Sequence, residues 1–197
     1  MLKKTESGHE LTRFGDLAIF LDILCEQYKV YSDFLNKRPS LDELNPEDII
    51  RLNHHQIDPL YISTIFSAMF LEAYIYDYGA RKSSASYIDK YIDKLDPPAK
   101  WIIVTKLFNN SGMESSSLAF QQIKQLFRFR NSLAHSKSKE FNGLESLKDR
   151  VSNILKPSEC VDLIINIMNE LLRFDPEELY AKMVVNRLET LKKEYPA

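Results

Sequence analysis

The sequence places an arginine and a histidine five residues apart, Arg130 and His135, in the stretch Arg-Asn-Ser-Leu-Ala-His. Arginine stays charged at any physiological pH, and its planar fork of N–H donors binds phosphate oxygens. Histidine gains and loses a proton near neutral pH and can therefore act as a general acid or base. These are the side chains that cleavage of RNA without a metal ion requires. Asn131 lies four residues before His135 and could orient the imidazole if the helix continues, or cap the helix end.

Arg130 is unusual because it interrupts an apolar stripe. Residues 115–134 are predicted to be helical, and the apolar residues of one face recur at helical spacing. The other members of this stripe are Ala119, Ile123, Leu126, Leu133 and Ala134. A charge on such a face needs a partner, because its desolvation is otherwise not compensated. Two interpretations stay open: an arginine that serves a site, or a structural arginine bonded to a carboxylate or to helix-end carbonyls.

A second charged residue breaks an apolar pattern at Glu72. It shares one face of the predicted helix 58–78 with Ile65, Ala68, Met69 and Tyr76. We expect Glu72 to lie near Arg130 and to hold its guanidinium in place.

The spacing of Arg130 and His135 does not by itself make one site. Five helical steps turn the two side chains about 140° apart around the axis. Either the helix ends near Ala134 and lets His135 turn back, or two copies of the chain pair so that their residues converge on one cleft. The simpler alternative is a surface histidine beside a helix end.

Basic residues surround the motif, although the formal net charge of the chain is −2. Arg128, Lys137 and Lys139 form a local basic cluster, and we expect any RNA contact to depend on it. The alternative for the lysines is a solvated loop.

The composition predicts one all-α domain. The 197 residues are 44% hydrophobic and include only five glycines, with no Asn-Gly or Asp-Gly hairpin signal. Helices are expected at 10–36, 58–78, 84–95, 96–108, 115–134, 144–155, 158–173 and 175–193. Residues 40–56 are expected to be a polar connector with room for one short helical turn. Asp-Pro pairs begin the helices at 58, 96 and 175, and Gly79 ends the second helix.

Other kinds of site are not supported by the sequence. Cys25 and Cys160 lie in apolar runs and are expected to be core thiols in a reducing compartment. The pair His54-His55 has no further ligand at metal-binding spacing, and we expect no metal or cofactor. The apolar run 59–78 contains two acidic residues, so we expect a buried helix of a soluble, cytoplasmic protein and no membrane span.

The chain resembles the HEPN superfamily in three places. These are Phe70-Leu71-Glu72-Ala73, then Lys100-Trp101, then Ile123 to His135 with its closing Arg-Asn-x3-His motif. The signature of that family is an arginine, usually followed by a polar residue, and a histidine after four to six positions. The resemblance covers residues 58–135. Residues 1–57, an N-terminal helix and connector, and residues 140–197, the C-terminal helices, are compatible additions to a single domain.

The resemblance implies a helical bundle that forms a homodimer with both motifs facing one cleft. Many members are metal-independent endoribonucleases in toxin–antitoxin or phage-defence systems, so an antitoxin or another protein partner is implied. Arg130 would stabilise the charged phosphorane, His135 would act as general acid or base, and Asn131 would support both. The alternative from the same family is a non-catalytic module that dimerises and binds a protein or nucleotide partner. A plain helical scaffold with a coincidental motif is the third interpretation.

Overall fold

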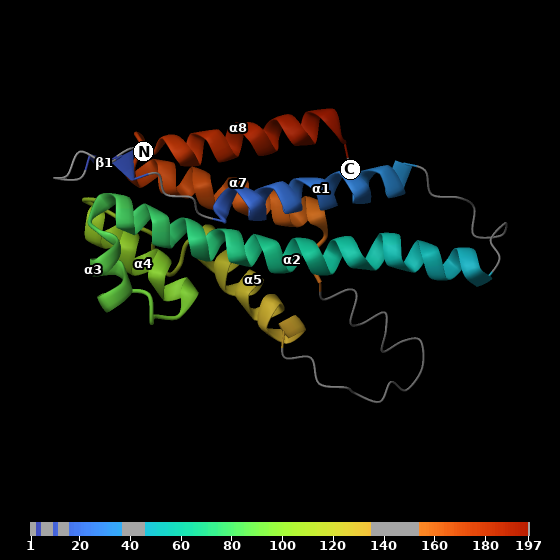
Figure 1. Cartoon of the computed structure of the whole chain (residues 1–197), viewed down its shortest axis with the longest axis horizontal. Coiled ribbons are helices and arrows are strands. Elements are labelled where there is room, and N and C mark those ends of the chain that lie inside the picture. Colours follow the sequence, from blue (N-terminus) through green and yellow to red (C-terminus); the bar gives the residue numbers. More distant parts are fainter. Residues whose placement is uncertain (1–2, 5–9, 12–15, 37–45, 135–153, 197) are drawn as a thin grey trace.

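The computed structural model describes residues 3–4, 10–11, 16–36, 46–134 and 154–196, with side chains for 16–36, 57–134 and 154–196. This part of the chain contains seven helices: α1 (Leu17–Asn36), α2 (Pro46–Lys82), α3 (Ala85–Tyr91), α4 (Pro97–Phe108), α5 (Leu118–Ala134), α7 (Pro157–Phe174) and α8 (Leu179–Glu194). Two-residue strands β1 (Lys3–Lys4) and β2 (Glu10–Leu11) pair antiparallel before them. The prediction of an all-α helical bundle is confirmed (Figure 1).

The long helix α2 is the centre of the bundle. α1 lies along α2, while α7 packs against α1, α2, α5 and α8. Helices α3, α4 and α5 gather on the side of α2 away from α8 (Figure 1). One hydrophobic core includes side chains from α1 through α8, so the C-terminal helices share it with the segment that carries the motif.

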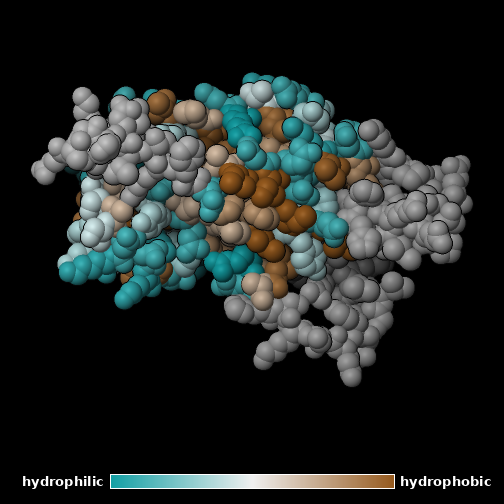
Figure 2. Space-filling model, viewed as in Figure 1, coloured by the Kyte–Doolittle hydropathy of each residue, from teal (hydrophilic) through white to brown (hydrophobic). Residues whose placement is uncertain are grey.

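Aromatic side chains of α2 and α4 fill the middle of this core. Tyr74 and Trp101 are completely buried, and their rings stack with centroids 6.1 Å apart. Their contact fixes α4 against α2, and α4 and α2 each supply a charged residue to the candidate site. Figure 2 shows that hydrophobic side chains also reach the surface over the middle of the face that carries α1 and α2.

The boundaries predicted for α2 were wrong at both ends. The helix begins at Pro46, so part of the predicted connector 40–56 is helical, and Asp58-Pro59 lies inside the helix. A proline in a helix removes one hydrogen bond, and here the helix continues past it. Gly79 is also inside the helix and does not end it. Its role is in packing, because a Cβ at this position would lie 2.8 Å from Ile88 Cδ1 and 3.3 Å from Val104 Cγ1. The absent side chain lets α3 and α4 approach α2.

Four other helix ends differ from the predictions by three residues or more, and one of them is the start of α5, at Leu118 instead of residue 115. α1 begins at Leu17, since Glu10 and Leu11 belong to a strand; the carbonyl of Asp16 accepts the first bond, from Phe20 N at 3.0 Å. α3 ends at Tyr91, well before residue 95. α8 begins at Leu179, because Asp175 ends α7 instead of opening the next helix. The predicted helix 144–155 lies almost wholly outside the described residues.

The apolar stretch of α2 does not have the character of a membrane span. No helix in the described part of the chain combines the length and the apolar composition that crossing a membrane requires.

Candidate functional site

Arg130 lies four residues before Ala134, the last residue of α5. The residues before it on the predicted stripe, Ala119, Ile123 and Leu126, are buried and anchor α5 to the core. Further along the same face, the residues are no longer buried, and the Arg130 side chain is 29% exposed. Ala134 is exposed, which corrects its prediction as part of the apolar face. The core therefore holds α5 firmly while the arginine reaches the surface.

Arg130 and Glu72 lie next to each other, as predicted. Arg130 Nη2 is 3.5 Å from Glu72 Oε2, which joins α5 to α2 across 58 residues of sequence. The face that carries Glu72 is more exposed than predicted, because Met69 is 38% exposed and the Glu72 side chain 37%. Glu72 thus lies at the margin of the helix contact, where its carboxylate keeps part of its hydration.

A second cation, Lys100, binds the same carboxylate and was missed as a site residue. Its Nζ lies 3.2 Å from Glu72 Oε1 and 3.0 Å from Asp93 Oδ1, and its side chain is only 4% exposed. The available signal was a lysine inside the apolar helix 97–108, directly before Trp101. Glu72 is therefore held between a buried lysine of α4 and the more exposed Arg130 of α5. We refer to Glu72, Lys100 and Arg130 as the motif site.

The aromatic ring of Phe127 supports the guanidinium from within α5. Arg130 Cζ lies 5.3 Å from the ring centroid, a cation–π distance. Within the described part of the chain, the ring and the long carboxylate contact restrict the direction of the side chain but occupy few of the five guanidinium N–H donors. The remaining donors can bind a phosphate.

The neighbouring motif residues are distributed around α5. Asn131 is exposed, as is Arg128, whose Cζ lies 5.5 Å from the Phe129 ring centroid. Arg128 lies about 200° around the helix from Arg130, so the two arginines do not converge within one chain. Leu133 packs beside a small cluster that includes Tyr31, and this contact holds the last turn of α5. His135, Lys137 and Lys139 lie outside the described residues.

The cysteines do not form a nucleophilic site. Cys25 and Cys160 are both buried and unbridged, which confirms the prediction of core thiols. Burial raises the pKa of the Cys160 thiol to about 12 and also raises that of Cys25, so neither is a thiolate near neutral pH. Among the described side chains no group of three could hold a metal ion, and the side chains of all four histidines lie outside that part of the chain.

A second charged cluster uses the α2 residues from Tyr74 to Lys82, which follow Glu72, and we call it the tyrosine clamp. Its members tie the α7–α8 turn to α2 and are Tyr74, Tyr78, Arg81, Lys82, Asp175 and Glu178. The Tyr74 hydroxyl donates to Glu178 at 3.1 Å, and Arg81 Nη2 lies 2.6 Å from the same oxygen. The Tyr78 hydroxyl is 3.0 Å from Asp175 Oδ2, and Lys82 Nζ is 2.5 Å from that atom.

Burial and the neighbouring charges shift the pKa values of three groups in the tyrosine clamp. Burial, and then the neighbouring Glu178 carboxylate, raise the pKa of Tyr74, and burial also raises the pKa of Tyr78. Burial alone would raise the pKa of Asp175, but hydrogen bonds from Lys82 and Tyr78 outweigh it and hold that pKa below its ordinary value. Each of these groups has a hydrogen-bond or ion-pair partner inside the protein, so the cluster stabilises the packing of the α7–α8 turn against α2.

Comparison with known proteins adds no relative to this picture. No family model, no curated protein and no solved structure matches the chain.

Proposed function

We propose that the protein is a metal-independent endoribonuclease of the HEPN type that acts as a homodimer. The observation that carries the proposal is the orientation and exposure of the Arg130 side chain. Glu72 and Phe127 orient it, it is partly exposed, and it lies five residues before a histidine. The side-chain freedom of an arginine held in this way is already restricted before a substrate binds, so little further entropy is lost when it binds a phosphodiester.

The proposed reaction uses the ribose of the substrate as the nucleophile. His135 of one copy takes the proton of the 2′-OH, whose oxygen attacks the adjacent phosphorus. Arg130 stabilises the negative charge that develops on the phosphorane oxygens, and Asn131 supports both residues. The 5′-oxygen then leaves with a proton, supplied by the His135 of the second copy. The products carry a 2′,3′-cyclic phosphate and a 5′-OH.

Exposed apolar side chains on α2 and α4, the helices that supply Glu72 and Lys100, support the homodimer. Met69 lies three residues before Glu72 on α2, while Ile103 and Leu107 follow Lys100 at helical spacing on α4. Their exposed fractions are 38%, 38% and 48%. A second copy that covers them would place two motifs in one cleft. The basic residues Arg128, Lys137 and Lys139 would then guide RNA to it, in a toxin–antitoxin or phage-defence setting with an antitoxin as the inhibitory partner.

The test is cleavage of end-labelled RNA in EDTA by the wild-type chain and three variants. We expect cleavage by the wild type, and a loss of about 100-fold or more in Arg130→Ala and in His135→Ala. Arg128→Ala is the matched control: it removes an arginine from the same helix but should lower cleavage less, through weaker RNA binding. The cyclic phosphate is identified by its resistance to phosphatase before acid treatment.

Two results would overturn the proposal. A folded wild-type chain that cleaves no RNA would favour the non-catalytic binding module. A strict monomer at micromolar concentration in size-exclusion chromatography would remove the two-copy cleft.

A further inference from the structure

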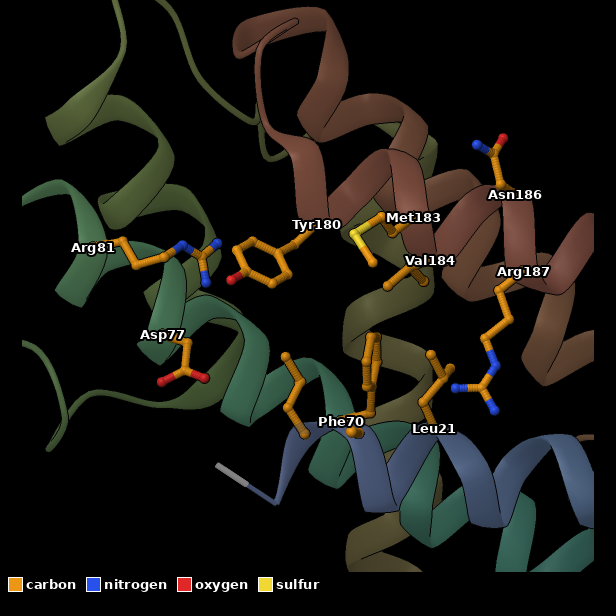
Figure 3. A pocket seen from close by; sticks show the side chains of 11 residues that line it. Leu21, Phe70, Asp77, Arg81, Tyr180, Met183, Val184, Asn186 and Arg187 are labelled. Atoms are coloured by element: carbon orange, nitrogen blue, oxygen red, sulfur yellow. The ribbon is translucent and has the colours of Figure 1, made fainter. Parts of the chain in front are cut away.

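A pocket of about 570 Å³ lies between α1, α2 and α8, on a different face of α2 from the motif site. Figure 3 shows side chains from all three helices directed into it. Its walls are mostly apolar and include Leu17, Leu21, Phe70, Met183 and Val184. A pocket of this size and composition lies in the range of about 300–1,000 Å³ that is usual for small-molecule sites.

The two ends of the pocket are closed by bridges between helices. At one end Arg187 of α8 pairs with Asp22 of α1. At the other end Arg81 of α2 lies over the ring of Tyr180 of α8, with Cζ 4.5 Å from the centroid (Figure 3). Tyr180 and Arg187 are seven residues apart on α8, so the space between the bridges is about 10 Å long. A partner helix would need an open groove several turns long, whereas a small molecule fits between the bridges.

The charged side chains of the pocket already have partners. Arg81 Nη2 lies 2.6 Å from Glu178, Arg187 is paired with Asp22, and Asp77 also has an interaction partner. A charged ligand would therefore lose hydration without meeting an uncompensated opposite charge. A neutral ligand pays no such cost and gains from the apolar walls.

We propose that this pocket binds a small, uncharged and largely apolar molecule. Its body lies against the accessible lining side chains Leu17, Ala18 and Tyr180, and the flexible Met183 side chain closes over it. The site is separate from the motif site, so the proposal does not depend on ribonuclease activity.

The test compares two fluorescent probes that share one skeleton. N-phenylnaphthylamine is neutral, and anilinonaphthalenesulfonate adds one sulfonate to the same rings. We expect saturable binding of one neutral probe per chain, with the sulfonate binding about tenfold more weakly or worse. Equal binding of both probes, tighter binding of the sulfonate, or no binding of the neutral probe would overturn the proposal.

Two neighbouring substitutions on α1 show whether the neutral probe occupies this pocket. Ala18 and Ile19 are both exposed, but only Ala18 is among the residues that line the pocket. Ala18→Trp should abolish saturable binding by filling the space, while Ile19→Trp should leave it unchanged. Both variants should keep the wild-type circular dichroism spectrum. If the two substitutions have the same effect, whether loss or retention, the probe binds elsewhere and the pocket assignment is wrong.

Discussion

The tyrosine clamp and the motif site both pair an arginine with a glutamate, but they hold the arginine differently. In the clamp, Arg81 lies 2.6 Å from Glu178, whose side chain is 8% exposed. In the motif site, Arg130 lies 3.5 Å from Glu72, whose side chain is 37% exposed. The short, buried Arg81–Glu178 pair holds the α7–α8 turn against α2. The longer, hydrated Arg130–Glu72 pair orients the guanidinium and leaves N–H donors that can bind a ligand.

Their positions on α2 keep the two clusters apart. Glu72 and Arg81 are nine residues apart, which places them on roughly opposite faces of the helix. The clamp faces the α7–α8 turn, and the motif site faces α4 and α5. Substitutions in one cluster should therefore leave the other nearly unaffected.

The largest effect on stability is expected from Arg81→Ala. This change leaves the Glu178 carboxylate buried without its cation, and we expect it to lower the free energy of unfolding by about 3 kcal/mol. Urea denaturation followed by circular dichroism measures the change. Lys106→Ala is the control, because Lys106 also pairs with a glutamate, Glu114, at 3.1 Å, but the two side chains are 46% and 66% exposed. If both variants lose the same small amount, the contrast between the clamp and a surface pair is wrong.

A smaller, pH-dependent effect is expected from Tyr78→Phe. Loss of the hydroxyl beside Asp175 should cost about 1 kcal/mol at neutral pH. The depressed pKa of Asp175 means that its stabilising contribution is present above its ordinary pKa of 3.8 and is lost as the pH falls through the lower folded-state value. The difference between the wild type and Tyr78→Phe should therefore shrink below about pH 4.

The control for this pH dependence is Tyr87→Phe. Tyr87 is 39% exposed on α3, away from the clamp carboxylates, so its hydroxyl should contribute little at any pH. A Tyr78→Phe deficit that stays constant from neutral to acid pH would show that Asp175 is not the group stabilised by the hydroxyl.

The smallest effect on stability is expected from Glu72→Gln. Its carboxylate is partly hydrated, and Lys100 keeps Asp93 as a partner, so the free energy of unfolding should change by less than about 1 kcal/mol. RNA cleavage should nevertheless fall by about tenfold, because the amide holds Arg130 less firmly. A large loss of stability with normal cleavage would make Glu72 a structural residue only.

The sequence predicted the helical bundle, and it predicted the Glu72–Arg130 contact from two charges that interrupt apolar stripes. It misplaced the ends of α2 because Pro59 and Gly79 are local signals for helix ends, while packing decides their use here. Gly79 is small because α3 and α4 approach it, and no local pattern records that approach.

The missed residues depend on contacts between distant segments. Lys100 resembles an ordinary helical lysine until α4 packs against α2 and places it beneath Glu72 and Asp93. Asp175 resembles a helix cap, but its carboxylate faces Tyr78 and Lys82, nearly a hundred residues earlier in the chain. Such pairings follow from tertiary packing, which single-sequence periodicity does not specify.

The most direct test of the central claim is Arg130→Lys, measured for both RNA cleavage and unfolding. Lysine keeps the positive charge near Glu72 but lacks the planar fork that braces a phosphate. We expect cleavage to fall by about 100-fold while the free energy of unfolding stays within about 1 kcal/mol of the wild type. Full cleavage by Arg130→Lys, or a loss of stability as large as that of Arg81→Ala, would contradict the account of Arg130 as a functional and not a structural arginine.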